Sequence, residues 1–154
     1  MAYPIRKLPN AATDAYRRDV AAWAAAQAEH ARAGRLGALD LPNIAAELEG
    51  LNASERNEIE SRLRVLLTHL LKTRHQPSRR TRSWLVTIAA QRLDIARMIR
   101  RSASLKRFPT ECLADAYTDA RKLAALETGL SLGRFPEACP FSIEQVLDEA
   151  WLPR

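Results

Sequence analysis

Apolar residues recur at helical spacing along most of this sequence of 154 residues, and no segment shows the two-residue alternation of a strand. The clearest stripe predicts a helix over about residues 53–75, with the apolar members Ile59, Leu63, Leu66, Leu67, Leu70 and Leu71. A second stripe predicts a helix over about 79–102, with Trp84, Leu85, Ile88, Ile95 and Ile99. Because the link around residues 76–78 is short and contains Pro77, the two helices should pack as an antiparallel hairpin.

Capping and helix-ending residues divide the remaining chain. Gly34 and Gly50 should each end a helix, and the string Asn52-Ala53-Ser54-Glu55 indicates a capping box that starts the next one. Ser142 with Gln145 indicates a second capping box. The further helices expected from these signals span about residues 13–33, 40–50, 109–129 and 142–149.

These elements predict an all-α fold, a helical bundle of about five helices with a long antiparallel central hairpin. Residues 1–12 contain Pro4 and Pro9 and are expected to form a flexible N-terminal arm. Residues 13–154 should form a single helical domain, because the length fits one domain and 47% of the residues are hydrophobic. Such a domain needs neither a disulfide nor a metal ion to fold.

The composition indicates where the protein is located and gives no sign of a metal or cofactor site. The longest wholly apolar run, residues 20–26, is too short to span a bilayer, and the first residues lack the order of a signal peptide, so we expect a cytoplasmic protein without a membrane partner. Cys112 and Cys139 are far apart in the sequence and should be reduced thiols. The histidines share no metal-ligand spacing and no nucleotide-binding loop is present, so we expect neither metal nor cofactor.

Positive charge is concentrated in the predicted hairpin. The formal net charge is +6, whereas residues 72–107 hold 11 Lys and Arg and a single acid, Asp94, which gives +10 for this segment and −4 for the rest. The two ends of the second hairpin helix carry clusters that lie roughly 30 Å apart at about 1.5 Å per residue. The candidate contacts for an anionic partner are Arg79, Arg80, Arg82, Arg100 and Arg101.

Two charged residues fall on apolar stripes, Glu60 on the first and Arg92 on the second. A charge on a buried face is costly unless it is paired, so we predict that Arg92 is at least partly buried and pairs with a carboxylate, Glu60 first and Glu47 second. A structural ion pair is the preferred interpretation, and we assign no catalytic residue. The cluster expected to hold the helices together or bind a partner is Glu47, Glu60, His69, Trp84, Gln91 and Arg92.

Short strings along nearly the whole chain, from about residue 13 to 153, resemble domain-of-unknown-function family 29. They are Asn43-Ile44-Ala45-Ala46-Glu47-Leu48-Glu49, Ser61-Arg62-Leu63, His69-Leu70-Leu71-Lys72, Gln76-Pro77, Arg82-Ser83-Trp84, Gln91-Arg92, Glu127-Thr128-Gly129-Leu130, Phe135-Pro136, Cys139-Pro140-Phe141 and Leu152-Pro153. The family more often has an acid where this chain has Ala46, which argues against a paired-carboxylate role there. The resemblance implies a bacterial, helical protein and names no reaction.

Three function classes follow. We expect a binding or adaptor module that acts through protein–protein contacts or self-association. Nucleic-acid binding through the basic hairpin 72–107 is an alternative, although no base-reading motif is present. An enzyme that uses an inter-helix Glu/His/Arg cluster is the third, and we favour it least because no motif specifies a reaction.

Overall fold

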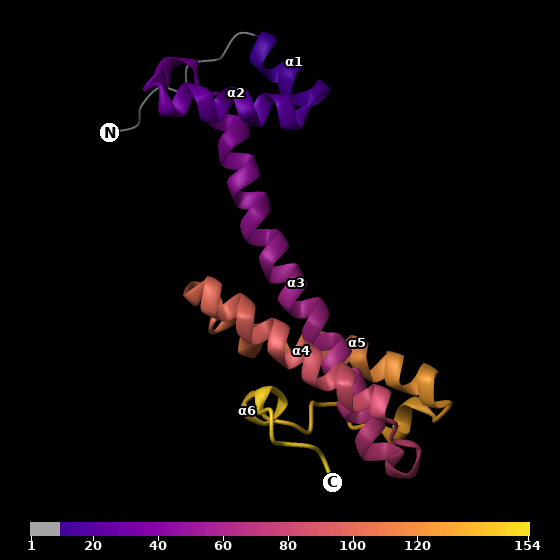
Figure 1. Cartoon of the computed structure of the whole chain (residues 1–154). Coiled ribbons are helices and arrows are strands. Elements are labelled where there is room, and N and C mark those ends of the chain that lie inside the picture. The colour runs from indigo at the N-terminus through magenta and orange to yellow at the C-terminus, as the bar shows by residue number, and fades with distance from the viewer. Residues whose placement is uncertain (1–9) are drawn as a thin grey trace. The chain divides into compact units, whose positions relative to one another are not determined.

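The computed structural model describes residues 10–154, and the side chains from residue 14 onwards. Within these residues the chain forms six α-helices and no strand, so the predicted all-α fold is confirmed (Figure 1). The helices are α1 Asn10–Arg18, α2 Val20–Arg32, α3 Leu41–His75, α4 Arg82–Arg101, α5 Phe108–Thr128 and α6 Ile143–Leu147. Short 3-10 turns η1 to η4 connect them at Leu36–Ala38, Pro77–Arg79, Ala103–Leu105 and Leu132–Arg134.

The chain divides into two compact units, Met1–Asn52 and Ala53–Arg154. The boundary falls within α3. Most of the predicted arm over residues 1–12 lies outside the described residues, and α1 begins at Asn10. The predicted single domain over 13–154 stays a prediction.

The N-terminal unit contains a small polar core around Asp40. The Trp23 indole donates to Oδ2 of Asp40 over 3.2 Å, and the Asp40 amide donates to Oε1 of Gln27 over 2.7 Å. Asn43 also donates to Oδ2 of Asp40, over 2.7 Å, and the Tyr16 ring packs edge-on against Trp23. Asp40 therefore joins α2 to the start of α3.

The prediction of one helix over about 13–33 is wrong, because the helix is interrupted at Asp19. Asp19 has extended backbone angles, and its carboxylate accepts the Ala22 amide over 2.9 Å. An aspartate at this position can satisfy a free N–H group at a helix start, which makes a new helix start favourable. Gly34 follows α2 in the left-handed conformation, with φ +69°, as predicted.

The predicted end at Gly50 is also wrong, because α3 continues from Leu41 to His75 without interruption. Gly50 does not have a positive φ, unlike Gly34 and Gly129. A glycine inside a helix costs only about 1 kcal/mol relative to alanine. A break would give up several backbone hydrogen bonds worth about 1 kcal/mol each. The helix therefore tolerates both Gly50 and the capping box that follows it.

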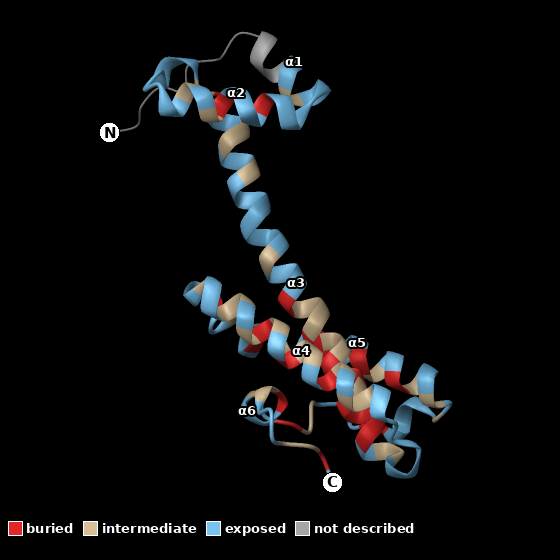
Figure 2. Ribbon diagram, viewed as in Figure 1, coloured by how far each residue is buried: buried red, intermediate tan, exposed pale blue. Residues whose placement is uncertain are grey.

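The core of the C-terminal unit is built on the predicted stripe of α3. All six of its members are fully buried, and Ile88 and Ile95 of α4 pack in the same cluster as its leucines. Figure 2 shows buried residues on α3, α4 and α5 of this unit. α5 contributes its small side chains Ala116, Ala120 and Ala124, which allow its backbone close to the neighbouring helices. The α3–α4 hairpin turns at η2, and Thr81 caps the start of α4 by accepting the Trp84 amide.

The segment after α5 folds back over this core. Tyr117 donates its hydroxyl proton to the Pro136 carbonyl over 2.6 Å, and Nε of Arg121 donates to the Phe135 carbonyl over 3.0 Å. Ser142 and Gln145 form the predicted capping box at the start of α6. Phe141 packs edge-on against Trp151, which holds the residues after α6 on the core.

Candidate binding groove

Arg92 is the most unusual side chain of the C-terminal unit, because it is 3% exposed and yet charged. Nε donates to the Val146 carbonyl over 2.8 Å and Nη2 to the Trp151 carbonyl over 2.9 Å. Longer contacts of 3.5 Å reach the carbonyls of Gln145 and Glu149. The predicted burial is confirmed, but the predicted carboxylate partner is wrong, because the hydrogen bonds of this guanidinium in the described chain end on main-chain carbonyls.

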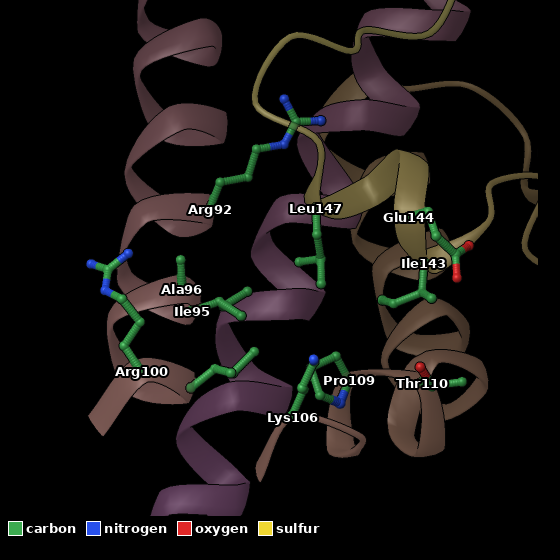
Figure 3. Close-up of a pocket in the computed structure, with 11 residues that line it drawn as sticks. Arg92, Ile95, Ala96, Arg100, Lys106, Pro109, Thr110, Ile143, Glu144 and Leu147 are labelled. Carbon is green, nitrogen blue, oxygen red and sulfur yellow. The ribbon is translucent and has the colours of Figure 1, made fainter. Parts of the chain in front are cut away.

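The shortness of α6 explains the contacts with the Val146 and Gln145 carbonyls, whereas the Glu149 and Trp151 carbonyls lie after the helix. The last four carbonyls of a helix have no partner within it, and α6 has only five residues. A guanidinium offers five N–H donors in a planar fork and can satisfy several carbonyls at once. Burial lowers the Arg92 pKa, and the nearby carboxylates of Asp148 and Glu149 act in the opposite direction. Arg92 thus fastens α6 and the residues after it to α4 (Figure 3).

A groove lies beside this fastening, between α4, the start of α5 and α6, with a cavity volume of about 460 Å³. Its floor is apolar, and Ile95 and Leu147 project into it from opposite sides (Figure 3). The exposed residues of its rim are Arg100, Lys106, Thr110 and Glu144. The remaining lining residues are Arg92, Ala96, Ile99, Pro109 and Ile143.

The rim of the groove carries more positive than negative charge. In the described residues neither Arg100 nor Lys106 has a carboxylate within ion-pair distance, whereas the neighbouring Arg97 pairs with Asp94 and Arg101 with Glu55. Glu144 lies on the side opposite Arg100 (Figure 3), and hydrogen bonds at the start of α6 lower its pKa. The rim therefore presents two free cations and one carboxylate.

A smaller cavity of about 320 Å³ lies on the other side of Arg92 along α4. It is lined by aliphatic side chains of α4, including Leu85 and Ile88, and by Glu149, Ala150 and Leu152 after α6. Arg92 lines both cavities, so its contacts with the carbonyls separate them.

The structure gives members of the predicted cluster separate partners. Glu47 accepts the Tyr16 hydroxyl in the N-terminal unit. His69 places Nδ1 3.0 Å from the Val65 carbonyl of its own helix. Glu60 is half-buried, and its charge contributes to the raised pKa of Cys112. Within the C-terminal unit, no hydrogen bond or ion pair joins Glu60, His69 and Arg92 to one another in the described residues.

The other two members also serve contacts of their own. The ammonium group of Lys72 lies over the Trp84 ring, with Nζ 4.4 Å from the ring centre. Lys72 also forms an ion pair with Glu127. Gln91 accepts a weak hydrogen bond from Arg62, which binds Asp94 more closely, at 2.6 Å. These contacts connect α3 with α4 and α5.

The predicted anionic-contact residues are all exposed. Arg79, Arg80 and Arg82 lie at the turn of the α3–α4 hairpin, and Arg100 lies on the groove rim. The sequence places Lys106 in the basic cluster at the end of the second hairpin helix, whereas Ile143 and Leu147 were not singled out. The apolar spacing of Ile143, Val146 and Leu147 after the Ser142 capping box was the available signal for this wall of the groove.

The two cysteine thiols are held in their protonated, unreactive form. Burial raises the pKa of the Cys112 thiol to about 11, and burial also raises that of Cys139. Both thiols are therefore protonated near neutral pH and are poor nucleophiles. Among residues 10–154, no group of three or more His, Cys, Asp or Glu side chains could hold a metal ion.

His75 is expected to make stability depend on pH. Its ring packs edge-on against Phe135, its Nε2 is buried without a partner in the described chain, and burial lowers its pKa, with Arg74 and Arg134 adding to the effect. In the unfolded chain His75 has its ordinary pKa near 6.5, so as pH falls it is protonated there before it is protonated in the folded protein. The free energy of unfolding should therefore fall as pH drops from about 7 to 5. Urea unfolding at several pH values should show this slope, and a His75→Leu variant should reduce it. An equal slope in both proteins would contradict the assignment.

The fold and the groove define an all-helical protein with an apolar groove in its C-terminal unit. The chain belongs to the family described as Domain of unknown function DUF29, which matches residues 15–152 and confirms the resemblance seen in the sequence. No curated protein and no solved structure matches the chain. None of the helices within the described residues combines the length and the apolar character needed to cross a bilayer.

Proposed function

We propose that this protein is a binding module, and that the groove between α4, α5 and α6 receives the apolar face of an acidic amphipathic helix of a protein partner. The observation that carries the proposal is an apolar groove with unpaired cations on its rim. The cytoplasmic location expected from the sequence is part of this proposal.

The size and lining of the groove support a helical ligand. The groove has apolar walls and few polar groups, and its volume is of the size of a small-molecule site, about 300–1,000 Å³, which is room for a few aliphatic side chains. An amphipathic helix presents apolar anchors at every third or fourth residue and places them in such a groove. The exposed Thr110 leaves the α5 side of the rim open to a partner.

Charge supports an acidic partner. Arg100 and Lys106 are free to pair across an interface, and α5 begins beside them at Phe108, where a helix start favours negative charge. The excess of basic residues over 72–107 would also speed the approach of an acidic protein.

A designed peptide pair tests the proposal. The probe is a fluorescent amphipathic peptide with leucines on one face and glutamates on the other, and its match carries lysines in place of the glutamates. Fluorescence polarisation at low salt should show binding of the acidic peptide only. An Arg100→Glu/Lys106→Glu variant should bind about ten-fold or more weakly, because two favourable charge contacts become repulsive.

The control reverses two equally exposed charges away from the groove, Arg79→Glu and Arg82→Glu. It changes the net charge by the same amount, so it should keep most of the affinity. Equal loss in both variants would show that the peptide responds to overall charge and would reject the groove as the site.

Nucleic-acid binding is the second candidate, and it is favoured by the three exposed arginines Arg79, Arg80 and Arg82 at the turn of the hairpin. A labelled oligonucleotide that binds the wild type and loses affinity in the Arg79/Arg82 control variant would support it. The enzyme alternative has no comparable support, because His69 and Arg92 bind main-chain carbonyls of different segments and no contact joins either to Glu60 in the described residues.

A further inference from the structure

The N-terminal unit has a core too small for its apolar content. Among its residues with described side chains, 14–52, only Trp23, Gln27 and Asp40 are buried, and two of these are polar. The same unit exposes several large aliphatic side chains, namely Val20, Leu36, Leu41, Leu48 and Leu51. Units of about this size are marginal in stability because they bury little of their surface, and association of chains is one way to add to that stability.

The exposed leucines of α3 and the half-buried Ile44 follow a heptad pattern. Leu41, Ile44, Leu48 and Leu51 are separated by three, four and three residues, which is the spacing of a coiled-coil seam. The next positions of the same pattern are Glu55 and Glu58, so the apolar seam ends where the N-terminal unit ends. The seam is therefore a feature of this unit alone.

Small residues of α2 have the complementary pattern. Ala21, Ala24, Ala28 and Ala31 show the same spacing of three, four and three residues. The last three line one side of an apolar cavity of about 350 Å³, and Leu41, Ile44 and Leu48 line the other. One unit thus displays large aliphatic side chains beside a row of small ones.

We propose that the N-terminal unit is a self-association surface, on which the Leu41–Leu51 seam of one chain packs against the alanine row of a second copy. A two-fold arrangement lets each copy insert its leucines over the alanines of the other, because both surfaces are present on every chain. The two helical hairpins then form one four-helix bundle and bury the seam that each exposes alone.

The net charge of the N-terminal unit favours association with a second copy over binding of a strongly charged partner. Residues 1–52 contain six Lys and Arg and six Asp and Glu, a net charge of zero, so two copies do not repel each other. The one charged residue that lines the cavity, Glu47, is already bound by the Tyr16 hydroxyl. The cavity therefore offers apolar contact and no free charge to attract a ligand of opposite sign.

Light scattering of the full chain after size exclusion tests this proposal. The wild type should have twice the chain mass of 17.3 kDa at micromolar concentration. A Leu48→Glu variant should be a monomer, with a dimer dissociation constant raised on the order of 100-fold or more, because the change occurs twice in a two-fold interface. Leu48 is 61% exposed, so circular dichroism should show unchanged helix content.

The matched control is Leu126→Glu, which adds the same charge at an 80% exposed leucine of α5. This variant should keep the dimer mass. A monomeric wild type across the concentration range, including one that binds a different protein through this seam, would overturn the proposal. A Leu48→Glu protein that remains dimeric would overturn it as well. Peptide binding at the α4–α6 groove should be the same in both variants, so the two proposals fail independently.

Discussion

Replacing Arg92 with methionine is expected to lower the free energy of unfolding of the C-terminal unit by about 3 kcal/mol, because buried acceptors left without a donor cost roughly 1–3 kcal/mol each. Methionine is similar in length and fills the same space without donors. The carbonyls of Val146 and Trp151 lose their closest partner, while removal of a buried charge offsets part of the cost. Hydrogen exchange should show the loss first in residues 143–152.

The Arg92→Lys variant separates charge from geometry. Lysine keeps the positive charge but offers its donors from one atom, which cannot span carbonyls on both sides of the α6 end. We expect it to lose most of the same stability. Arg97→Met is the control, since Arg97 is exposed and pairs only with Asp94 in the described chain, and should change stability by less than about 0.5 kcal/mol. Unchanged protection of residues 143–152 in Arg92→Met would refute the role assigned to Arg92.

Helical periodicity predicts the core of the C-terminal unit well, because one stripe of leucines leaves a single face to bury. All six members of the predicted α3 stripe are fully buried. Local signals were less reliable at helix ends. Asp19 starts a new helix although the apolar spacing continues across it, so the break could not be seen in the pattern. Gly50 lies within a helix although glycine is a common signal for a helix end. In both cases the result depends on a balance of about 1 kcal/mol that a pattern cannot resolve.

The partner of Arg92 could not be predicted from spacing, because spacing identifies the face of a helix and not what covers it. The segment that covers it lies more than 50 residues further along the chain. A guanidinium binds carbonyls as well as carboxylates, so burial of Arg92 did not require Glu60. The groove was missed for the same reason, since its walls come from three separate segments.

Several of the sequence strings that carry the family resemblance make the contacts that hold the residues after α5 against the core. Gln91-Arg92 and Leu152-Pro153 lie at or near the α6 contacts, and Phe135-Pro136 supplies the carbonyls bound by Arg121 and Tyr117. These residues act on the fold, whereas the groove uses ordinary aliphatic side chains and exposed cations. The distinctive part of the sequence thus explains the architecture, and tests of binding belong on the groove.

Phe135→Ala is expected to cost about 3–5 kcal/mol of unfolding free energy, because the loss of a buried phenylalanine leaves a cavity. Phe135 is 1% exposed, and its ring packs edge-on against His75 with ring centres 4.7 Å apart. Removing the ring also admits water to His75, so the pKa of His75 should move back towards its ordinary value. The variant should therefore be less stable at pH 7 and show a weaker fall in stability between pH 7 and 5.

The control for Phe135 is Leu132→Ala in the neighbouring turn η4. Leu132 is 42% exposed, so this change should cost less than about 1 kcal/mol and leave the pH slope intact. Urea unfolding of the three proteins at pH 7 and pH 5 gives both quantities. A stability loss in Phe135→Ala with an unaltered slope would mean that the packing is as described but that another group carries the pH dependence. A loss no larger than that of Leu132→Ala would mean that the Phe135 ring does not hold this segment on the core.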